Sequence, residues 1–177
     1  MLTIIPAETP EQIVTVRELM MEYATWLEFK LCFQGFEEEL RALPGKYAAP
    51  EGRLFLAMWA NESGNSQIDA GQVSGIGALR PLTDAGPDIC EMKRLYVRAA
   101  FRGHSIGRAM AEKLIADARA IGYSKMLLDT VPGKMDSAIR LYRELGFKEV
   151  CPYYSSPVEH TLFMELDLNA ALVSRLA

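Results

Sequence analysis

The chain of 177 residues has few cysteines and histidines, and this shortage excludes several classes of protein. Its three cysteines, Cys32, Cys90 and Cys151, are odd in number, lie far apart and form no CxxC pair. Its two histidines, His104 and His160, are also far apart. We therefore expect no disulfide scaffold and no metal site, and the thiols fit a reducing, cytoplasmic environment.

Long apolar runs and an excess of basic charge are missing as well. The longest run without polar residues, glycine or proline is Leu54–Ala60, whereas a membrane-spanning helix needs about 20 apolar residues. Residues 1–5 lack the basic start and apolar length of a signal peptide. Nineteen basic against 23 acidic residues give a net charge of −4. We therefore expect no membrane partner and no nucleic-acid partner, because nucleic-acid binding requires a basic face.

What the chain does contain is a series of helix and strand patterns. Thr9-Pro10-Glu11-Gln12 has the form of a capping box, and apolar residues at helical spacing extend it to about Phe29. Asn61–Asn65 resembles a turn. Further helices are predicted at 36–42, 105–122 and 136–145, and strands at 54–59, 72–79, 89–97, 125–129 and 161–168.

The element order is β-α-α-β-β-β-α-β-α-β-β, without internal repeats, low-complexity tracts or linkers. Half of the residues are apolar, and the length is close to that of one domain. These features predict a single mixed α/β domain over residues 1–177.

A candidate anion site lies where the predicted strand at 89–97 leads through a short turn into a helix. The first N–H groups of a helix lack intrahelical partners, and the helix dipole adds positive charge there. Arg102 and Arg108 could add charged hydrogen bonds to a phosphate. The Walker and dinucleotide glycine patterns are both absent. In the alternative interpretation, Gly103 and Gly107 only permit a tight turn and close helix packing.

These residues resemble a known family. Arg102-Gly103-His104-Ser105-Ile106-Gly107 is similar to the [Q/R]xxGx[G/A] acetyl-CoA loop of the GNAT N-acetyltransferase superfamily. The segments 95–97 and 138–147 resemble two further landmarks, the second being A-x-x-(L/F)-Y-x-x-x-G-F. The resemblance covers nearly the whole chain. It implies a mixed, mostly antiparallel sheet with a splayed parallel strand pair and helices on both faces.

The resemblance also implies which residues bind acetyl-CoA. They come from a coenzyme-binding core at about 88–150, while about 1–50 form a helical acceptor side. The implied binding residues are Leu95, Tyr96, Val97, Arg102, Gly103, His104, Ser105, Ile106, Gly107 and Arg108. Two positions depart from the family pattern. Ser105 replaces a glycine, at a cost if positive φ is needed, although a serine can also cap a helix. Met135 replaces an asparagine, so a contact to the pantetheine arm is missing or is made by backbone.

Acetyl transfer to an amine needs a base, an oxyanion donor and an acid for the departing thiolate. Tyr142 matches the family tyrosine that faces the coenzyme sulfur, although it could also be a core residue. Glu91 matches a catalytic glutamate of histone-acetylating relatives, and strand alternation would place it on one face with Leu95 and Val97. Alternatively, Glu91 pairs with Lys93 or with a base on a neighbouring strand. The oxyanion donor would be a main-chain N–H near Val97, and Cys90 should point to the opposite face.

The acceptor side has weaker signals. We expect its aromatic residues to be mostly core: Tyr23, Trp26, Phe29, Phe33, Phe36, Tyr47, Tyr153 and Tyr154. The acidic triplet 37–39 is expected to be a solvated face, and Arg80 could bind an acceptor carboxylate. Asp129 is a helix cap or a substrate contact, with the structural role favoured. His104 is expected to face solvent more readily than to touch a phosphate.

Together these features predict an N-acetyltransferase that moves acetyl from acetyl-CoA to a primary amine of a small molecule or amino acid by direct attack. It would need no covalent acetyl-enzyme and no metal, and a homodimer is compatible with the chain. The competing hypothesis is a non-catalytic acyl-CoA-binding or sensor domain of the same fold. Ser105 and Met135 favour that alternative, whereas Tyr142 and Glu91 favour catalysis.

Overall fold

The computed structural model describes residues 1–28, 35–60 and 71–170. Its sheet has seven strands in the order β1-β2-β3-β4-β5-β7-β6. The strands are β1 (Leu2–Pro6), β2 (Arg53–Trp59), β3 (Gln72–Pro81), β4 (Ile89–Val97), β5 (Lys125–Thr130), β6 (Lys148–Val150) and β7 (Leu162–Asp167). Every neighbouring pair is antiparallel except β4 and β5, which run parallel. The predicted mixed, mostly antiparallel sheet is therefore confirmed.

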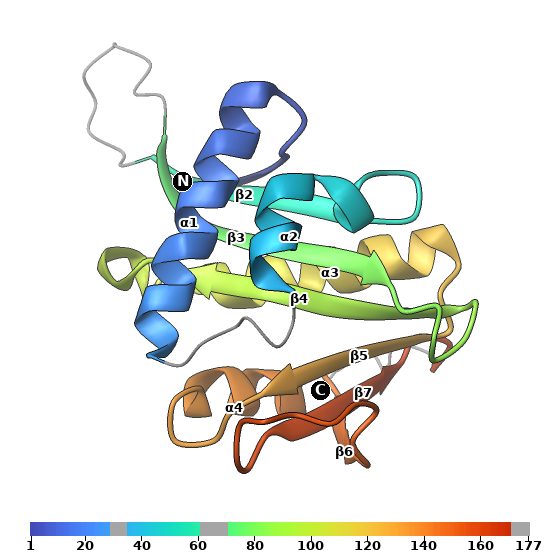
Figure 1. The fold of residues 1–177 in the computed structure, drawn as a ribbon. Coiled ribbons are helices and arrows are strands. Elements are labelled where there is room, and N and C mark those ends of the chain that lie inside the picture. The colour runs from blue at the N-terminus through green and yellow to red at the C-terminus, as the bar shows by residue number, and fades with distance from the viewer. Residues whose placement is uncertain (29–34, 61–70, 171–177) are drawn as a thin grey trace, which may run out of the picture.

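Helices cover both faces of the sheet (Figure 1). On one face lie α1 (Pro10–Leu27) and α2 (Phe36–Ala42), and on the other α3 (Ile106–Ile121) and α4 (Asp136–Glu144). Two short 3-10 helices, η2 (Gly45–Tyr47) and η3 (Ala99–Phe101), precede β2 and α3. One apolar core packs between the sheet and α3 and α4, and a second between the sheet and α1 and α2. None of the helices in the described segments is both long and apolar enough to cross a membrane.

The start of α1 follows the predicted capping box. The N–H of Gln12 donates to the hydroxyl of Thr9 at 3.3 Å, and the N–H of Thr9 donates to the side-chain oxygen of Gln12 at 2.9 Å. The end differs from the prediction, because the helix stops at Leu27 and Glu28 takes a left-handed conformation with φ 63°. Phe29, Phe33, Cys32 and the predicted turn 61–65 lie outside the described residues.

An extra residue in β4 changes which side chains share a face. Two steps along β3, from Ile76 to Ala78, correspond to three along β4, from Tyr96 to Lys93. This is a β-bulge, and Arg94 within it has φ 58°. The bulge reverses the alternation of side chains beyond it. The prediction that Glu91 shares a face with Leu95 and Val97 is therefore wrong.

The observed packing shows the two faces of β4 directly. Cys90 and Met92, before the bulge, and Leu95 and Val97, after it, all pack in the core beneath α3 and α4. Glu91 points to the opposite face, as predicted for a neighbour of Cys90, and bonds Arg80 there. Burial raises the pKa of the Cys90 thiol to about 12, so this thiol is un-ionised at neutral pH.

The parallel pair separates soon after it forms. β4 and β5 are paired only from Ile89 with Lys125 to Glu91 with Leu127. Beyond Glu91, β4 continues for six residues to Val97 and β5 for three to Thr130 without pairing to each other. The predicted splayed pair is confirmed, and the separation leaves room for ligands between the two strands.

Candidate active site

A groove of about 510 Å³ runs along the start of α3 and the open end of β4. It is lined by nine of the ten predicted coenzyme residues: Leu95, Tyr96, Val97, Arg102, Gly103, Ser105, Ile106, Gly107 and Arg108. The exception is His104. Its exposed ring packs edge-on against Trp59 with centroids 4.7 Å apart, and its Nδ1 lies 3.2 Å from the carbonyl oxygen of Phe101. The predicted solvent-facing position of His104 is therefore confirmed.

The start of α3 has the properties expected of an anion site. Among the residues that the structure describes, none accepts a hydrogen bond from the N–H of Ile106, Gly107 or Arg108. Such unpaired N–H groups at the positive end of a helix bind phosphate well. The groove thus offers main-chain donors that fit the phosphates of a coenzyme.

Ser105 adopts a backbone conformation that is unfavourable for serine. It precedes α3 with φ 58° and ψ 15°, the left-handed conformation in which glycine is favoured. Its side chain makes no capping hydrogen bond, so the suggestion that serine serves as the helix cap is wrong. The position therefore has the positive φ at which serine, unlike glycine, is disfavoured.

Cationic and aromatic side chains close one side of the groove. The guanidinium of Arg102 lies 5.0 Å from the ring centroid of Trp26, and the ammonium of Lys134 lies 5.3 Å from it. Arg102 also donates to the carbonyl oxygen of Val97 at 3.1 Å. Trp26 thereby connects α1 to both loops of the groove.

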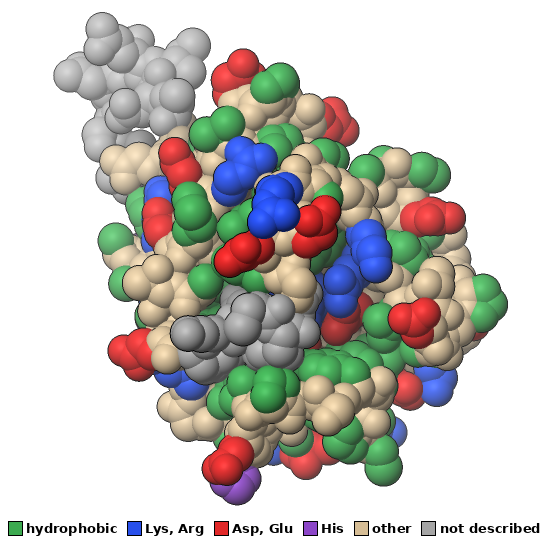
Figure 2. Space-filling model, viewed as in Figure 1, with side chains coloured by type: hydrophobic (Ala, Val, Ile, Leu, Met, Phe, Trp, Pro, Cys, Tyr) green, Lys and Arg blue, Asp and Glu red, His purple; other side chains and the backbone are tan. Residues whose placement is uncertain are grey.

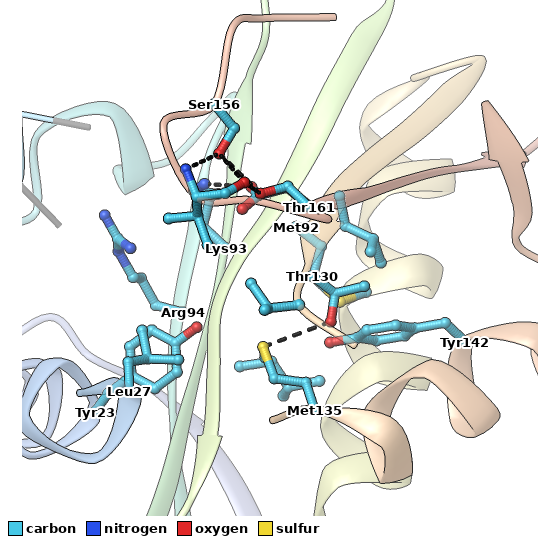
Figure 3. A pocket seen from close by; sticks show the side chains of 15 residues that line it. Tyr23, Leu27, Met92, Lys93, Arg94, Thr130, Met135, Tyr142, Ser156 and Thr161 are labelled. Carbon is cyan, nitrogen blue, oxygen red and sulfur yellow. Dashed lines mark hydrogen bonds and ion pairs between the residues drawn. The ribbon is translucent and has the colours of Figure 1, made fainter. Parts of the chain in front are cut away.

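A smaller cavity of about 30 Å³ joins the groove at Tyr142, Leu95 and Met135, which line both. It lies between the separated ends of β4 and β5 and is also lined by α1 and by the segment before β7 (Figure 3). Tyr142 is 4% exposed, and burial raises its pKa, so its phenol stays protonated at neutral pH. The predicted acid thus lies where the groove meets the cavity.

Glu91 does not line this cavity. Its carboxylate is 1% exposed and accepts from Nε of Arg80 at 2.8 Å and from the hydroxyl of Tyr153 at 2.8 Å. Nζ of Lys93 is 3.6 Å away. The alternative interpretation of Glu91 as an ion-paired residue therefore describes its contacts. Arg80, the candidate for binding an acceptor carboxylate, pairs with this internal carboxylate.

Lys93 lies between Glu91, which is outside the cavity, and Asp129, which lines it. Nζ of Lys93 donates to Asp129 at 2.7 Å, and both residues line the cavity. Burial alone would raise the pKa of Asp129, but the Lys93 ammonium outweighs it and the pKa is lowered. Asp129 is not the helix cap considered from the sequence, because α4 begins after Met135, and Asp136 bonds the N–H of Gly133.

A second buried ion pair fixes the bulge in β4. Nε and Nη2 of Arg94 donate to the two carboxylate oxygens of Glu39 at 2.9 and 2.6 Å. The two side chains are 3% and 11% exposed. The expectation of a solvated acidic triplet is therefore wrong for Glu39, although Glu37 and Glu38 are exposed and pair with Arg41 on the charged surface over α2 (Figure 2).

Three comparisons with known proteins agree with this geometry. The model of the acetyltransferase (GNAT) family matches residues 15–147. An uncharacterised N-acetyltransferase of Schizosaccharomyces pombe is 32% identical over 168 residues, which cover 95% of this chain and 96% of the relative.

Solved structures share the fold. A GNAT-family acetyltransferase of Staphylococcus aureus superposes with a TM-score of 0.70 at 18% identity, over 95% of this chain and 99% of that one. A Salmonella typhimurium protein solved with its cofactor acetyl-CoA gives a TM-score of 0.63 at 19% identity, over 100% and 99% of the two chains.

Proposed function

Because the chain belongs to the GNAT family of acetyltransferases, we propose that this acetyl-CoA-dependent acyltransferase acetylates a primary amine of a small molecule or amino acid. The observation that carries the proposal is the junction of groove and cavity at Tyr142. A coenzyme bound along the groove would present its thioester there, and an amine in the cavity would meet it. Residues 1–177 would act as one domain, with a coenzyme-binding core at about 88–150 and an acceptor side at about 1–50.

The coenzyme is proposed to lie against the start of α3. The unpaired N–H groups of Ile106, Gly107 and Arg108 would bind its phosphates, and Arg102 lies beside them. Leu95, Val97 and Leu141 give the rest of the groove an apolar wall that suits a pantetheine arm. Met135 lies at the start of α4 in the place where the family pattern has an asparagine, and contributes a thioether to the wall rather than an amide.

The proposed reaction is direct attack of the neutral amine on the thioester carbonyl. A carbon–nitrogen bond forms and the carbon–sulfur bond breaks, with a main-chain N–H near Val97 as the predicted oxyanion donor. The phenol of Tyr142 would give its proton to the departing sulfur. This donor is available because burial keeps it protonated.

Glu91 lies outside the cavity, so an amine bound in the cavity cannot give its proton to that carboxylate directly. We propose Glu91 as the final acceptor of the amine proton, which reaches it from the cavity through Asp129 and Lys93. The Glu91→Gln variant tests this role. The variant should lower kcat roughly 100-fold if the carboxylate takes the proton. An unchanged kcat would leave Glu91 with only its structural ion pairs.

The Tyr142→Phe variant tests the function as a whole. We expect kcat to fall by roughly 10²–10⁴-fold, because a general acid is lost, while the Kd of acetyl-CoA stays the same. Release of free thiol, with amino acids and small primary amines as acceptors, measures kcat. Calorimetric titration of acetyl-CoA measures the Kd. The sensor-domain alternative predicts acetyl-CoA binding without thiol release in either protein, and Ser105 and Met135 are the residues that favour it.

The proposed setting is cytoplasmic. Both cysteines within the described segments, Cys90 and Cys151, are free thiols, as the reducing cytoplasm favours. A homodimer is compatible with this proposal.

A further inference from the structure

Two phenol hydroxyls face each other across the small cavity. Tyr23 comes from α1 and Tyr142 from α4, and each points its oxygen into the space between β4 and β5 (Figure 3). Tyr23 is 8% exposed, and its ring packs against Tyr96 and Trp26. Burial raises its pKa to about 12, so it carries a proton at neutral pH. The packing of the ring accounts for the aromatic side chain, but it does not account for the hydroxyl.

The hydroxyl of Tyr23 makes no hydrogen bond with any residue of the described segments. The described segments contain no fully buried side-chain oxygen or nitrogen without a hydrogen-bond partner, so this hydroxyl is open to the cavity although the side chain around it is largely buried. Phenylalanine would give the same ring contacts without placing a polar atom on the cavity wall. An unpaired hydroxyl that a buried side chain directs into a cavity points to a ligand that bonds it.

The other polar groups on the cavity wall already have partners inside the protein. Lys93 pairs with Asp129, and Arg94 pairs with Glu39. The hydroxyl of Thr130 lies 3.5 Å from the sulfur of Met135. Ser156 and Thr161 bond to each other at 2.8 Å. The phenols of Tyr23 and Tyr142 are therefore the described polar side chains of the cavity wall that are available to bond a group entering the cavity.

We infer that Tyr23 binds the amine nitrogen of the acceptor, on the side of the cavity opposite Tyr142. This inference rests on the proposed function. The phenol oxygen accepts a hydrogen bond from the amine N–H, which leaves the nitrogen lone pair directed at the thioester. A space of about 30 Å³ admits a group of about the size of a water molecule, so it suits the head of a primary amine.

A pair of coenzyme analogues tests the inference without knowledge of the natural acceptor. In S-(2-aminoethyl)-CoA the sulfur carries a short amine that reaches beyond it into the cavity. S-propyl-CoA has the same length and ends in a methyl group. Calorimetric titration gives the ratio of the two Kd values for the wild type and for Tyr23→Phe, which removes only the hydroxyl.

We expect Tyr23→Phe to weaken binding of the aminoethyl analogue by roughly tenfold and to leave the propyl analogue unchanged. A Kd ratio that stays within about twofold of the wild-type ratio would overturn the inference while the proposed function stands. If the wild type binds neither analogue nor acetyl-CoA, the proposed function itself fails. The two failures are therefore distinguishable.

The stability of two matched variants provides a second test. The hydroxyl of Tyr47 is buried and donates to Glu39 at 2.7 Å, whereas that of Tyr23 is unbonded. We expect Tyr47→Phe to raise the unfolding equilibrium constant by roughly 5- to 150-fold, and Tyr23→Phe to leave it unchanged or lower it. Urea unfolding measures both. An equal loss in Tyr23→Phe would show that its hydroxyl has a structural partner, and would overturn the inference.

Discussion

The groove proposed for the coenzyme (the coenzyme groove) and the cavity proposed for the acceptor (the acceptor cavity) meet at Tyr142, yet they are built in different ways. Most of the groove comes from one continuous stretch, residues 95–108, and its proposed anion site consists of main-chain N–H groups. The cavity is lined by side chains from α1, β4, β5, α4 and the segment before β7. Its walls are held by buried ion pairs between residues far apart in the sequence. A backbone site depends on local chain geometry, whereas a side-chain site depends on long-range packing.

The largest expected effect is on the acceptor half. Glu39→Gln leaves Arg94 buried without its carboxylate partner and should destabilise the protein by about 3–5 kcal/mol. Glu38→Gln is the matched control, since Glu38 is 75% exposed and its one ion-pair partner within the described residues is the exposed Arg41. Its effect should be below about 0.5 kcal/mol. Urea unfolding at pH 7 measures both variants, and equal losses would contradict this assignment.

The same ion pair has a defined dependence on pH. Burial opposes ionisation of Glu39, but hydrogen bonds from Arg94 and Tyr47 outweigh it and hold its pKa below 4.5. A carboxylate with a lowered pKa in the folded state stabilises the protein above its unfolded pKa. That stabilisation is lost as the pH falls through the folded pKa. The stability difference between wild type and Glu39→Gln should therefore be complete above pH 4.5 and shrink below it.

A smaller effect, confined to the coenzyme half, is expected for Gly107→Glu. A Cβ atom at this position would meet only Cγ2 of Val97, at an ordinary distance of 3.8 Å, so the fold should tolerate a side chain. A carboxylate there opposes phosphate at the helix start, and we expect roughly 100-fold weaker binding of acetyl-CoA. Gly107→Gln, of nearly equal size and without charge, is the control. If it weakens binding equally, the cause is steric rather than electrostatic.

The smallest effect concerns the strained residue of the coenzyme loop. Ser105→Gly removes the penalty of a left-handed non-glycine residue, roughly 1–2 kcal/mol, and adds the entropic cost of glycine, roughly 0.5–1 kcal/mol. The net expectation is a gain of about 0.5–1 kcal/mol in the free energy of unfolding. Thermal and urea unfolding can detect it. A loss of stability would mean that the serine side chain has a role that its missing cap bond does not reveal.

Much of the fold could be predicted from local patterns. The capping box Thr9–Gln12, the helix start after Ser105 and the left-handed Gly122 that ends α3 all depend on neighbouring residues. The separation of β4 and β5 was expected only through the family resemblance. The residues that line the groove were predicted from the same resemblance. The motif that carries the resemblance lies in the continuous stretch of chain that forms most of the groove.

The position of Glu91 shows where this kind of inference fails. Alternation along an ideal strand put it with Leu95 and Val97, but the bulge at Arg94 separates them. Sequence alone offers little signal for such a bulge, since it is stabilised by Glu39 from α2. Tyr23 was similarly hidden, because a tyrosine at helical spacing looks the same whether its hydroxyl is bonded or free.

The sequence by itself therefore determined the order of the elements, the helix start proposed to bind an anion, and the family. These depend on hydrogen bonds and φ angles within a few residues of each other. Only the tertiary structure decided which charges are buried together, that Glu91 is turned away from the cavity and that Tyr23 is turned into it. Those outcomes depend on contacts between residues such as Arg94 and Glu39, 55 positions apart, whose burial in a low-dielectric core makes each partner necessary to the other.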